Sequence, residues 1–204
     1  TVVDASVEEC AASKVSILGS REDARNAKRW GLTFLKAINV NPHTLYYITT
    51  RNLGLPGLSL RDGRSKVIWC KQDNGKVIVD VSDTKELEKK YPVKARNVLG
   101  KAHTVWVFEP LDPIGGVPQT SVTFTTKVDL GGAFFSSIMN KLAPGFLAIV
   151  SNMRRKFDKS NEINAFKRQQ IIEKFEEIAT EGAPGIESHF DEIDGAQEIS
   201  SGFI

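Results

Sequence analysis

The segment from Gln119 to Phe157 constrains the fold of this chain more than any other stretch. Its first part alternates apolar and polar residues with a period of two, which is typical of a strand with one buried face. One face comprises Val122, Phe124, Thr126, Val128 and Leu130, and the other comprises Thr123, Thr125, Lys127 and Asp129. After Gly131-Gly132, apolar residues recur at steps of three and four, which predicts a long helix with a broad apolar stripe. The stripe comprises Phe135, Ile138, Leu142, Phe146, Ile149 or Val150, Met153 and Phe157. This order predicts a helix packed over a curved sheet.

Two residue types modify that helix. Pro144 has no backbone N–H, so it should kink the helix or begin its second half. The stripe ends in Arg154-Arg155-Lys156, where cations suit the negative end of the helix dipole. A basic cluster in this position is usually a solvated helix end, and any further role needs an additional argument.

Two short helices are expected before the sheet. Ser6, with Glu9 three residues later, is a capping-box pattern, and the helix that it starts should end before Gly19. A second helix is predicted over residues 20–30. Because the two helices follow each other directly, there is little room here for a crossover between parallel strands.

Between residues 33 and 130 the sequence predicts about seven antiparallel strands joined by short turns. Asp73-Asn74-Gly75 is a strong signal for a tight hairpin turn. The expected strands are 33–40, 43–50, 64–71, 76–82, a segment through Arg96, 103–109 and the central strand from Gln119. Helices before and after a run of strands indicate an α+β fold with a curved antiparallel sheet around the long C-terminal helix.

Composition narrows the class of protein. The chain has 204 residues, of which 41% are hydrophobic and 25% charged, with a net charge of +2. This balance gives no support for nucleic-acid binding, and no apolar run approaches the roughly 20 residues that span a bilayer. The N-terminal residues do not have the pattern of a signal peptide. The two cysteines, Cys10 and Cys70, are expected to be reduced thiols in a cytoplasmic setting.

The C-terminal part is expected to differ from the rest. Residues 160–180 predict another helix, which Gly182 and Pro184 should end. The remainder is acidic and rich in Ser and Gly, as in a tail or linker. The predicted organisation is one domain over 1–158 and a helical extension with an acidic tail or linker over 159–204.

A series of short phrases occurs in a fixed order along residues 1 to about 157. They are Val3 to Glu9, Trp30, Tyr46-Tyr47, Leu60-Arg61-Asp62, Val107 to Leu111 and Val128 to Gly132. Together they resemble the START domain, the lipid-binding module named for steroidogenic acute regulatory protein. The resemblance implies a helix-grip fold, in which a curved antiparallel sheet grips a C-terminal helix around a tunnel that holds one lipid.

Several positions depart from the START pattern. The helix and strand that the family has before Asp4-Ala5-Ser6 are missing. Gly63 stands where an aromatic is usual, and Gly31 replaces the usual Asp or Asn. The arginine of phosphatidylcholine-binding members corresponds to Ala27, and the buried arginine of sterol-binding members to Val67. The lipid class (sterol, phospholipid or sphingolipid) therefore stays open.

The resemblance also implies a set of wall residues for the tunnel. They are Tyr47, Thr49, Val67, Trp69, Arg96, Trp106, Phe124, Thr126, Phe135, Ile138, Met139, Leu142, Phe146, Val150 and Met153. The plainer interpretation is that the apolar members form an ordinary core. Arg96 is either an interior polar anchor or an exposed charge, and Arg61-Asp62 is either a structural ion pair or a ligand contact. Arg154, Arg155, Lys156 and Lys159 are the candidate contacts to an anionic membrane surface.

The leading hypothesis is a non-catalytic protein that binds a single lipid and transfers it between membranes, with no cofactor. The alternative is a lipid-sensing or protein-interaction module of a larger multidomain protein, without transfer activity. An enzyme is disfavoured because His43, His103 and His189 lie in separate regions without metal-ligand spacing. The expected partners are a lipid, a transient membrane surface and further domains of a longer chain, but not nucleic acid. The expected location is the cytoplasm, peripheral to membranes.

Overall fold

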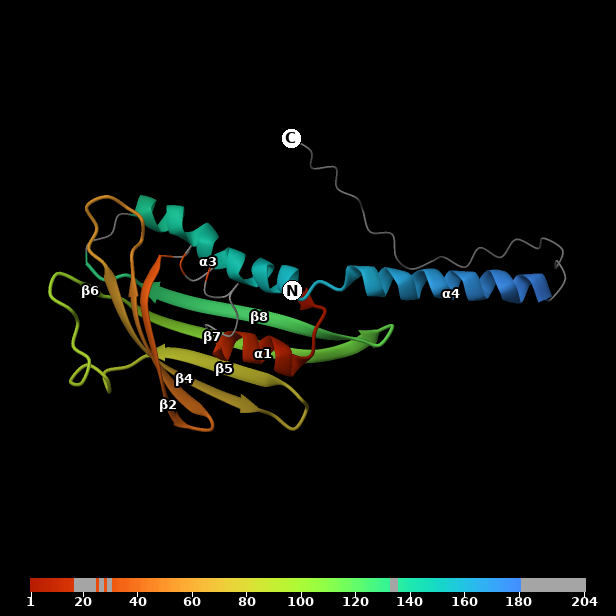
Figure 1. Ribbon diagram of the computed structural model, residues 1–204, viewed down its shortest axis with the longest axis horizontal. Coiled ribbons are helices and arrows are strands. Elements are labelled where there is room, and N and C mark those ends of the chain that lie inside the picture. Colours follow the sequence, from red (N-terminus) through yellow and green to blue (C-terminus); the bar gives the residue numbers. More distant parts are fainter. Residues whose placement is uncertain (17–24, 26–27, 29–30, 133–135, 181–204) are drawn as a thin grey trace. The chain divides into compact units, whose positions relative to one another are not determined.

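An antiparallel sheet curves around the core of the protein (Figure 1). The computed structural model describes residues 1–16, 25, 28, 31–132 and 136–180, although the side chains at 136–139, 141–142, 146–147 and 179–180 lie outside the description. The chain divides into two units, Thr1–Asn164 and Ala165–Ile204. The sheet and the candidate site belong entirely to the first unit.

Eight strands form the sheet of the described part of the chain. Their bounds are β1 Val2–Val3, β2 Leu32–Asn41, β3 Thr44–Arg51, β4 Arg61–Lys71, β5 Val77–Asp83, β6 Val98–Leu99, β7 Lys101–Ile114 and β8 Val117–Asp129. Seven strands follow the order β1-β8-β7-β5-β4-β3-β2 with antiparallel neighbours. The two-residue β6 pairs with the start of β4 in the parallel sense.

Three helices are described: α1 Val7–Val15, α3 Ser136–Lys156 and α4 Ser160–Thr180. The capping box of α1 is confirmed, because the Glu9 N–H donates to Ser6 Oγ at 3.2 Å and the Ser6 N–H donates to Glu9 Oε2 at 3.0 Å. Pro144 lies inside α3, which continues through it. The second helix predicted over 20–30 falls almost entirely outside the described residues.

The core lies between the helices α1 and α3 and the face of the sheet that is turned toward them, the inner face. Cys10 from α1, Met153 from α3 and Phe108 from β7 are each at most 2% exposed. Trp106 joins β7 to β8, since its ring is tilted against that of Phe124 at 4.5 Å. Within β7, its ring is parallel to that of Phe108 at 6.0 Å. Burying a large apolar side chain contributes roughly 1.5–3 kcal/mol, so this cluster holds α1 and the end of α3 to the sheet.

The helix-grip architecture predicted from the sequence is confirmed, with three local differences. β4 begins at Arg61 rather than Arg64, and β7 continues through Asp112-Pro113 to Ile114. The strand predicted through Arg96 is absent from that place: Arg96 has a φ of 69° in a loop, and the short β6 follows it. β6 depends on a parallel partner that is distant in sequence, so local alternation could not reveal it.

Candidate functional site

The inner face has two parts that differ in burial. In the closed half, nearly all side chains are buried: Leu45, Tyr47, Val67, Val77, Val79, Trp106, Phe108 and Val122. Trp69, the partner of Val79, is half-buried. In the open half, farther along the same strands, the residues are only half-buried: Leu35, Thr49, Gly63, Ser65, Val81, Thr104, Phe124 and Thr126. α1 packs on β5 and β7, and its Val7, Cys10 and Ala11 join the closed-half core, so this helix accounts for much of the difference.

A pair of hydroxyl groups lies in the open half. Thr104 on β7 and Thr126 on β8 are direct partners across the ladder, and their Oγ1 atoms lie 2.8 Å apart. Each threonine hydroxyl has one hydrogen and two acceptor lone pairs. When one hydroxyl donates to the other, the second hydrogen stays available, so the pair can bind a hydroxyl or carbonyl oxygen of a ligand.

Gly63 lies in the same half and is closely approached by the neighbouring strand. It is paired with Thr49 on β3, and a Cβ atom at residue 63 would lie only 2.6 Å from Thr49 Oγ1. The START resemblance predicts an aromatic side chain at this position. The chain departs from that pattern, because the close approach of Thr49 Oγ1 leaves no room for a larger residue at position 63.

The end of the open half is fixed to the residues that follow β8. Arg61 is 6% exposed, and its Nε donates to the Leu130 carbonyl at 2.7 Å while its Nη1 donates to Ser59. Gly131 has a φ of +68°, and a Cβ there would lie 2.4 Å from the Leu99 carbonyl oxygen. The hydrogen bond from Arg61 and the close approach of Gly131 to Leu99 show that the residues directly after β8 lie tightly against the sheet.

Asp62 lies on the opposite, outer face. Its carboxylate accepts hydrogen bonds from Thr50 Oγ1 at 2.8 Å, Asn97 Nδ2 at 2.8 Å and the Lys94 N–H at 3.0 Å. Arg64 Nη2 lies 3.5 Å away. Burial alone would raise the pKa of Asp62, but these hydrogen bonds and the charge of Arg64 together hold it below its usual value.

Arg64 extends this cluster to the loop between β5 and β6. Its Nε donates to the Tyr91 carbonyl at 2.8 Å and its Nη2 donates to the Pro92 carbonyl at 3.0 Å. Asp62 and Arg64 therefore hold the loop against the outer face. The hypothesis of a structural ion pair at Arg61-Asp62 needs correction, since the partner of Asp62 is Arg64. Adjacent residues of a strand point to opposite faces, whereas residues two apart share one.

The structure brings together many of the predicted wall residues. Tyr47, Val67 and Trp106 lie in the closed half, and the Tyr47 hydroxyl donates to the Val15 carbonyl at the end of α1. Thr49, Phe124 and Thr126 lie in the open half. Trp69 is half-buried on the inner face with its ring 6.5 Å from that of His43. From α3, Met153 is buried and Val150 packs half-buried on the core.

Other predicted wall residues are placed differently. Arg96 does not line the inner face: it is exposed, in the loop before β6, so it is a surface charge and not an interior anchor. Phe135 lies outside the described residues. The same holds for four side chains of α3, those of Ile138, Met139, Leu142 and Phe146.

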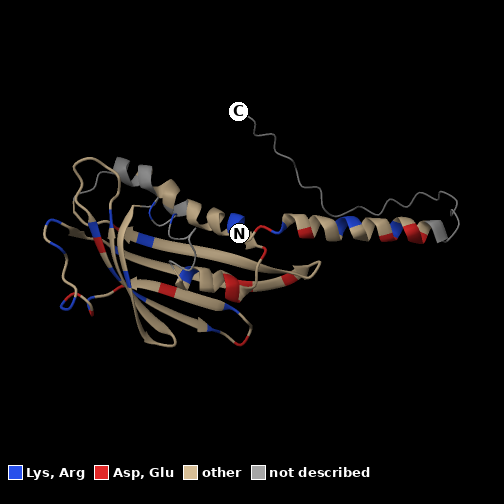
Figure 2. Cartoon of the chain, viewed as in Figure 1, with Lys and Arg blue, Asp and Glu red and all other residues tan. Residues whose placement is uncertain are grey.

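The basic end of α3 lies at the surface, where Figure 2 shows it in blue. Arg154, Arg155 and Lys156 are exposed, and Lys159 is half-buried. The Lys159 N–H donates to Asp4 Oδ2 at 3.1 Å, which ties this end of α3 to the N-terminal strand.

Other features of the described residues bear on metal binding and catalysis. Among them, no three side chains of His, Cys, Asp or Glu are grouped so that they could hold a metal ion. No helix in the same residues is long and apolar enough to cross a membrane. His103 Nε2 and Asp80 Oδ2 are hydrogen-bonded at 2.7 Å. Burial raises the pKa of the Cys10 thiol to about 11, which makes it a poor nucleophile.

A sheet that grips a helix, with a half-buried and partly polar inner face, defines the START class of fold. Solved structures that are similar to this chain include the following two. One is a fragment of the STAR-related lipid transfer protein from Xanthomonas axonopodis, with 16% identity and a TM-score of 0.56, covering 77% of this chain and 82% of that one. The other is human StAR-related lipid transfer protein 5, with 19% identity and a TM-score of 0.53, covering 83% and 74%. No family model and no curated protein sequence matches. The chain thus has a START-like fold.

Proposed function

We propose that this protein binds a single lipid between the open half of the inner face and α3, and transfers it between membranes without covalent chemistry. The observation that carries the proposal is the half-burial of Val81, Thr104 and Thr126. These residues lie on the inner face of β5, β7 and β8. The side chains of the closed half on the same strands are buried. Both similar structures are, by name, lipid transfer proteins, which supports the same kind of ligand here. Residues 1–158 would form the lipid-binding domain, with 159–204 as an extension.

The energetics favour a lipid as the occupant of such a space. Each buried CH₂ group contributes roughly 0.8 kcal/mol, so a long acyl chain gains on the order of 10 kcal/mol before ordering costs. Apolar contacts come from Val81 and Phe124. The Thr104–Thr126 hydroxyl pair supplies a polar contact for one ligand oxygen, which would orient the lipid. Binding sites for small molecules typically combine apolar walls with a few such polar groups.

The basic end of α3 supplies the second part of the proposal. Arg154, Arg155, Lys156 and Lys159 would contact an anionic membrane surface, and each cation near such a surface is worth about 1 kcal/mol. The protein would then act at the cytoplasmic face of membranes as a peripheral protein, loading and releasing its lipid while it is docked.

Native mass spectrometry of the purified protein, followed by organic extraction, tests the interior site. We expect one lipid per chain. Thr126→Phe would fill the open half and remove the adduct, whereas Thr125→Phe, on the exposed outer face of the same strand, would keep it. Loss of lipid from both variants, or no lipid uptake by the wild type from mixed liposomes, would contradict the interior site.

Transfer is tested separately from binding. Fluorescent lipid should move from donor to acceptor vesicles faster in the presence of wild-type protein, and the Thr126→Phe variant should lose this acceleration. A protein that takes up lipid stoichiometrically but leaves the exchange rate unchanged would be a lipid sensor and not a carrier.

A further inference from the structure

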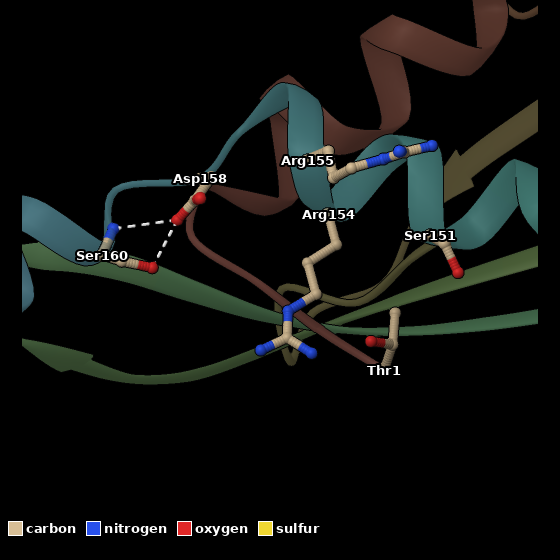
Figure 3. Close-up of a pocket in the computed structure, with 6 residues that line it drawn as sticks. All are labelled: Thr1, Ser151, Arg154, Arg155, Asp158 and Ser160. Carbon is tan, nitrogen blue, oxygen red and sulfur yellow. Dashed lines mark hydrogen bonds between the residues drawn. The ribbon is translucent and has the colours of Figure 1, made fainter. Parts of the chain in front are cut away.

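A hollow of about 540 Å³ lies where α3 ends and α4 begins (Figure 3). It is lined by Thr1, Ser151, Arg154, Arg155, Asp158 and Ser160, all within the first unit of the chain. The Arg154 side chain extends from α3 toward Thr1, whereas Arg155 extends in a different direction. The lining residues carry two guanidinium groups, three hydroxyls and one carboxylate, and the hollow has the size of a small-ligand site.

Arg154 is the cation of this hollow that is placed to bind a ligand. Arg155 donates to the Asn152 side chain. The ion pairs among the described residues involve other cations than Arg154. The one carboxylate in the lining, Asp158, accepts hydrogen bonds from the Ser160 N–H and hydroxyl. These bonds, with the charge of Arg154, lower the pKa of Asp158. Two arginines against one carboxylate leave the lining with a net positive charge.

The walls are held in place independently of any ligand. Asp4 accepts the Lys159 N–H at 3.1 Å, and Asp158 fixes Ser160 at the first residue of α4. Met153, one residue before Arg154, is 2% exposed in the core. Because the backbone on both sides of the hollow is fixed, little ordering of the chain is needed before a ligand binds.

We propose that this hollow binds a phosphomonoester group, with Arg154 as the principal contact and the hydroxyls of Thr1 and Ser151 beside it, since the Ser160 hydroxyl already donates to Asp158. The planar guanidinium matches two phosphate oxygens at once, and serine and threonine hydroxyls donate to the others. The group could come from a lipid headgroup in a membrane or from a soluble phosphomonoester. The inference rests on the proposed docking of this end of α3, but not on the interior lipid site.

Vesicle binding distinguishes a phosphate site from general attraction by charge. Phosphatidylcholine vesicles would carry either phosphatidic acid, a phosphomonoester, or phosphatidylglycerol, a phosphodiester, in amounts that give equal surface potential. We expect the wild type to bind the phosphatidic acid vesicles about tenfold more tightly, the effect of one or two hydrogen bonds to a charged group. Isothermal titration with glycerol 3-phosphate reports binding of the soluble form.

Three variants define the contact. Arg154→Gln should erase the preference for phosphatidic acid, and Arg154→Lys, which keeps the charge but loses the planar fork, should reduce it. Lys156→Gln removes the same charge outside the hollow, so it should weaken binding to both vesicles and keep their ratio. Thermal unfolding of each variant checks that the exposed substitutions leave the fold intact.

The outcomes separate the phosphate site from the docking of the basic end of α3 on a membrane. Preference for phosphatidic acid that depends on Arg154 would support a membrane source of the phosphate. Arg154-dependent binding of glycerol 3-phosphate without vesicle preference would support a soluble source. Equal binding to both vesicles, with no glycerol 3-phosphate binding, would overturn the phosphate site but leave docking intact. If the protein binds neither anionic vesicles nor glycerol 3-phosphate, both the phosphate site and the membrane docking are wrong. The interior lipid site is tested independently, by lipid uptake measured with mass spectrometry.

Discussion

The closed and open halves of the inner face are built on the same strands and differ in what covers them. Val122 and Thr126 are four residues apart on β8 and point to the same face, yet Val122 is 2% exposed and Thr126 is half-buried. The closed half lies under α1. The apolar Val122 thus lies where the strand is covered, and the polar Thr126 lies where it is partly uncovered. The comparison teaches that a side chain on the inner face is fully buried where a helix covers it. Where the cover is incomplete, the side chain stays accessible to a ligand.

The strongest test of this comparison is a matched pair of truncations. Phe108→Ala removes a fully buried ring from the closed half, which should cost about 3–5 kcal/mol. Phe124→Ala removes the same group from the half-buried part, and we expect roughly half of that loss. Urea denaturation followed by fluorescence measures both. Equal losses would show that the open half is packed as densely as the closed half.

Asp62→Asn tests whether the cluster on the outer face supports the open half. The substitution leaves Arg64 buried without its counter-charge, which should cost about 2 kcal/mol. Hydrogen exchange should rise first in the loop between β5 and β6 and at the start of β4. Faster exchange confined to α1 would contradict this assignment.

The same variant carries a pH dependence. The folded-state pKa of Asp62 is below its usual value of 3.8, so the stabilisation by its carboxylate is fully present above pH 3.8. It is lost as the pH falls through the folded-state pKa. Wild-type stability should therefore fall more steeply than that of Asp62→Asn below about pH 4. Parallel curves would assign the acid sensitivity to other carboxyl groups.

The hydroxyl pair of the open half is tested by Thr104→Val with Thr126→Val. Both changes keep the shape and remove the polar atoms together, so stability should change by less than about 1 kcal/mol. The bound lipids should shift toward species that lack an oxygen near this position, as read by extraction and mass spectrometry. An unchanged lipid profile would show that the pair does not contact the ligand.

Thiol reactivity gives the smallest and cheapest comparison. Cys10 is buried in the closed half with its pKa raised to about 11, whereas Cys70 is exposed. At about pH 8 a disulfide reagent should modify only Cys70 quickly in the folded protein, and both Cys70 and Cys10 after unfolding. Rapid modification of Cys10 without denaturant would mean that α1 detaches readily from the sheet.

Much of the fold could be predicted because its signals are local. The alternation from Val122 to Leu130 marks β8, and the Ser6 and Glu9 pair marks the start of α1. The expected helix over 160–180 coincides with α4, Ser160–Thr180. Each of these depends on residues close in sequence, and such patterns remain readable without knowledge of the tertiary structure.

The parts of the site that escaped prediction depend on distant partners. Thr104 was not among the expected residues, although Thr126 was, because only the register of β7 and β8 pairs them. The predicted strand begins at Arg64, whereas β4 begins at Arg61. With the observed start, strand alternation places Asp62 and Arg64 on the same face. The hollow at Arg154 needs Thr1 and Ser160 together, and no sequence pattern links residues so far apart.

The pairing of β1 with β8 has a consequence for the time course of folding. Val3 lies opposite Thr120, and Asp4 binds the N–H of Lys159, so the first strand cannot find its place until most of the domain exists. At roughly 5–20 residues per second of synthesis, the first strand waits on the order of ten seconds for its partner. Such distant contacts slow folding and leave the new chain exposed meanwhile. Until β8 has been synthesised, α1 lacks part of the sheet against which it packs in the folded protein.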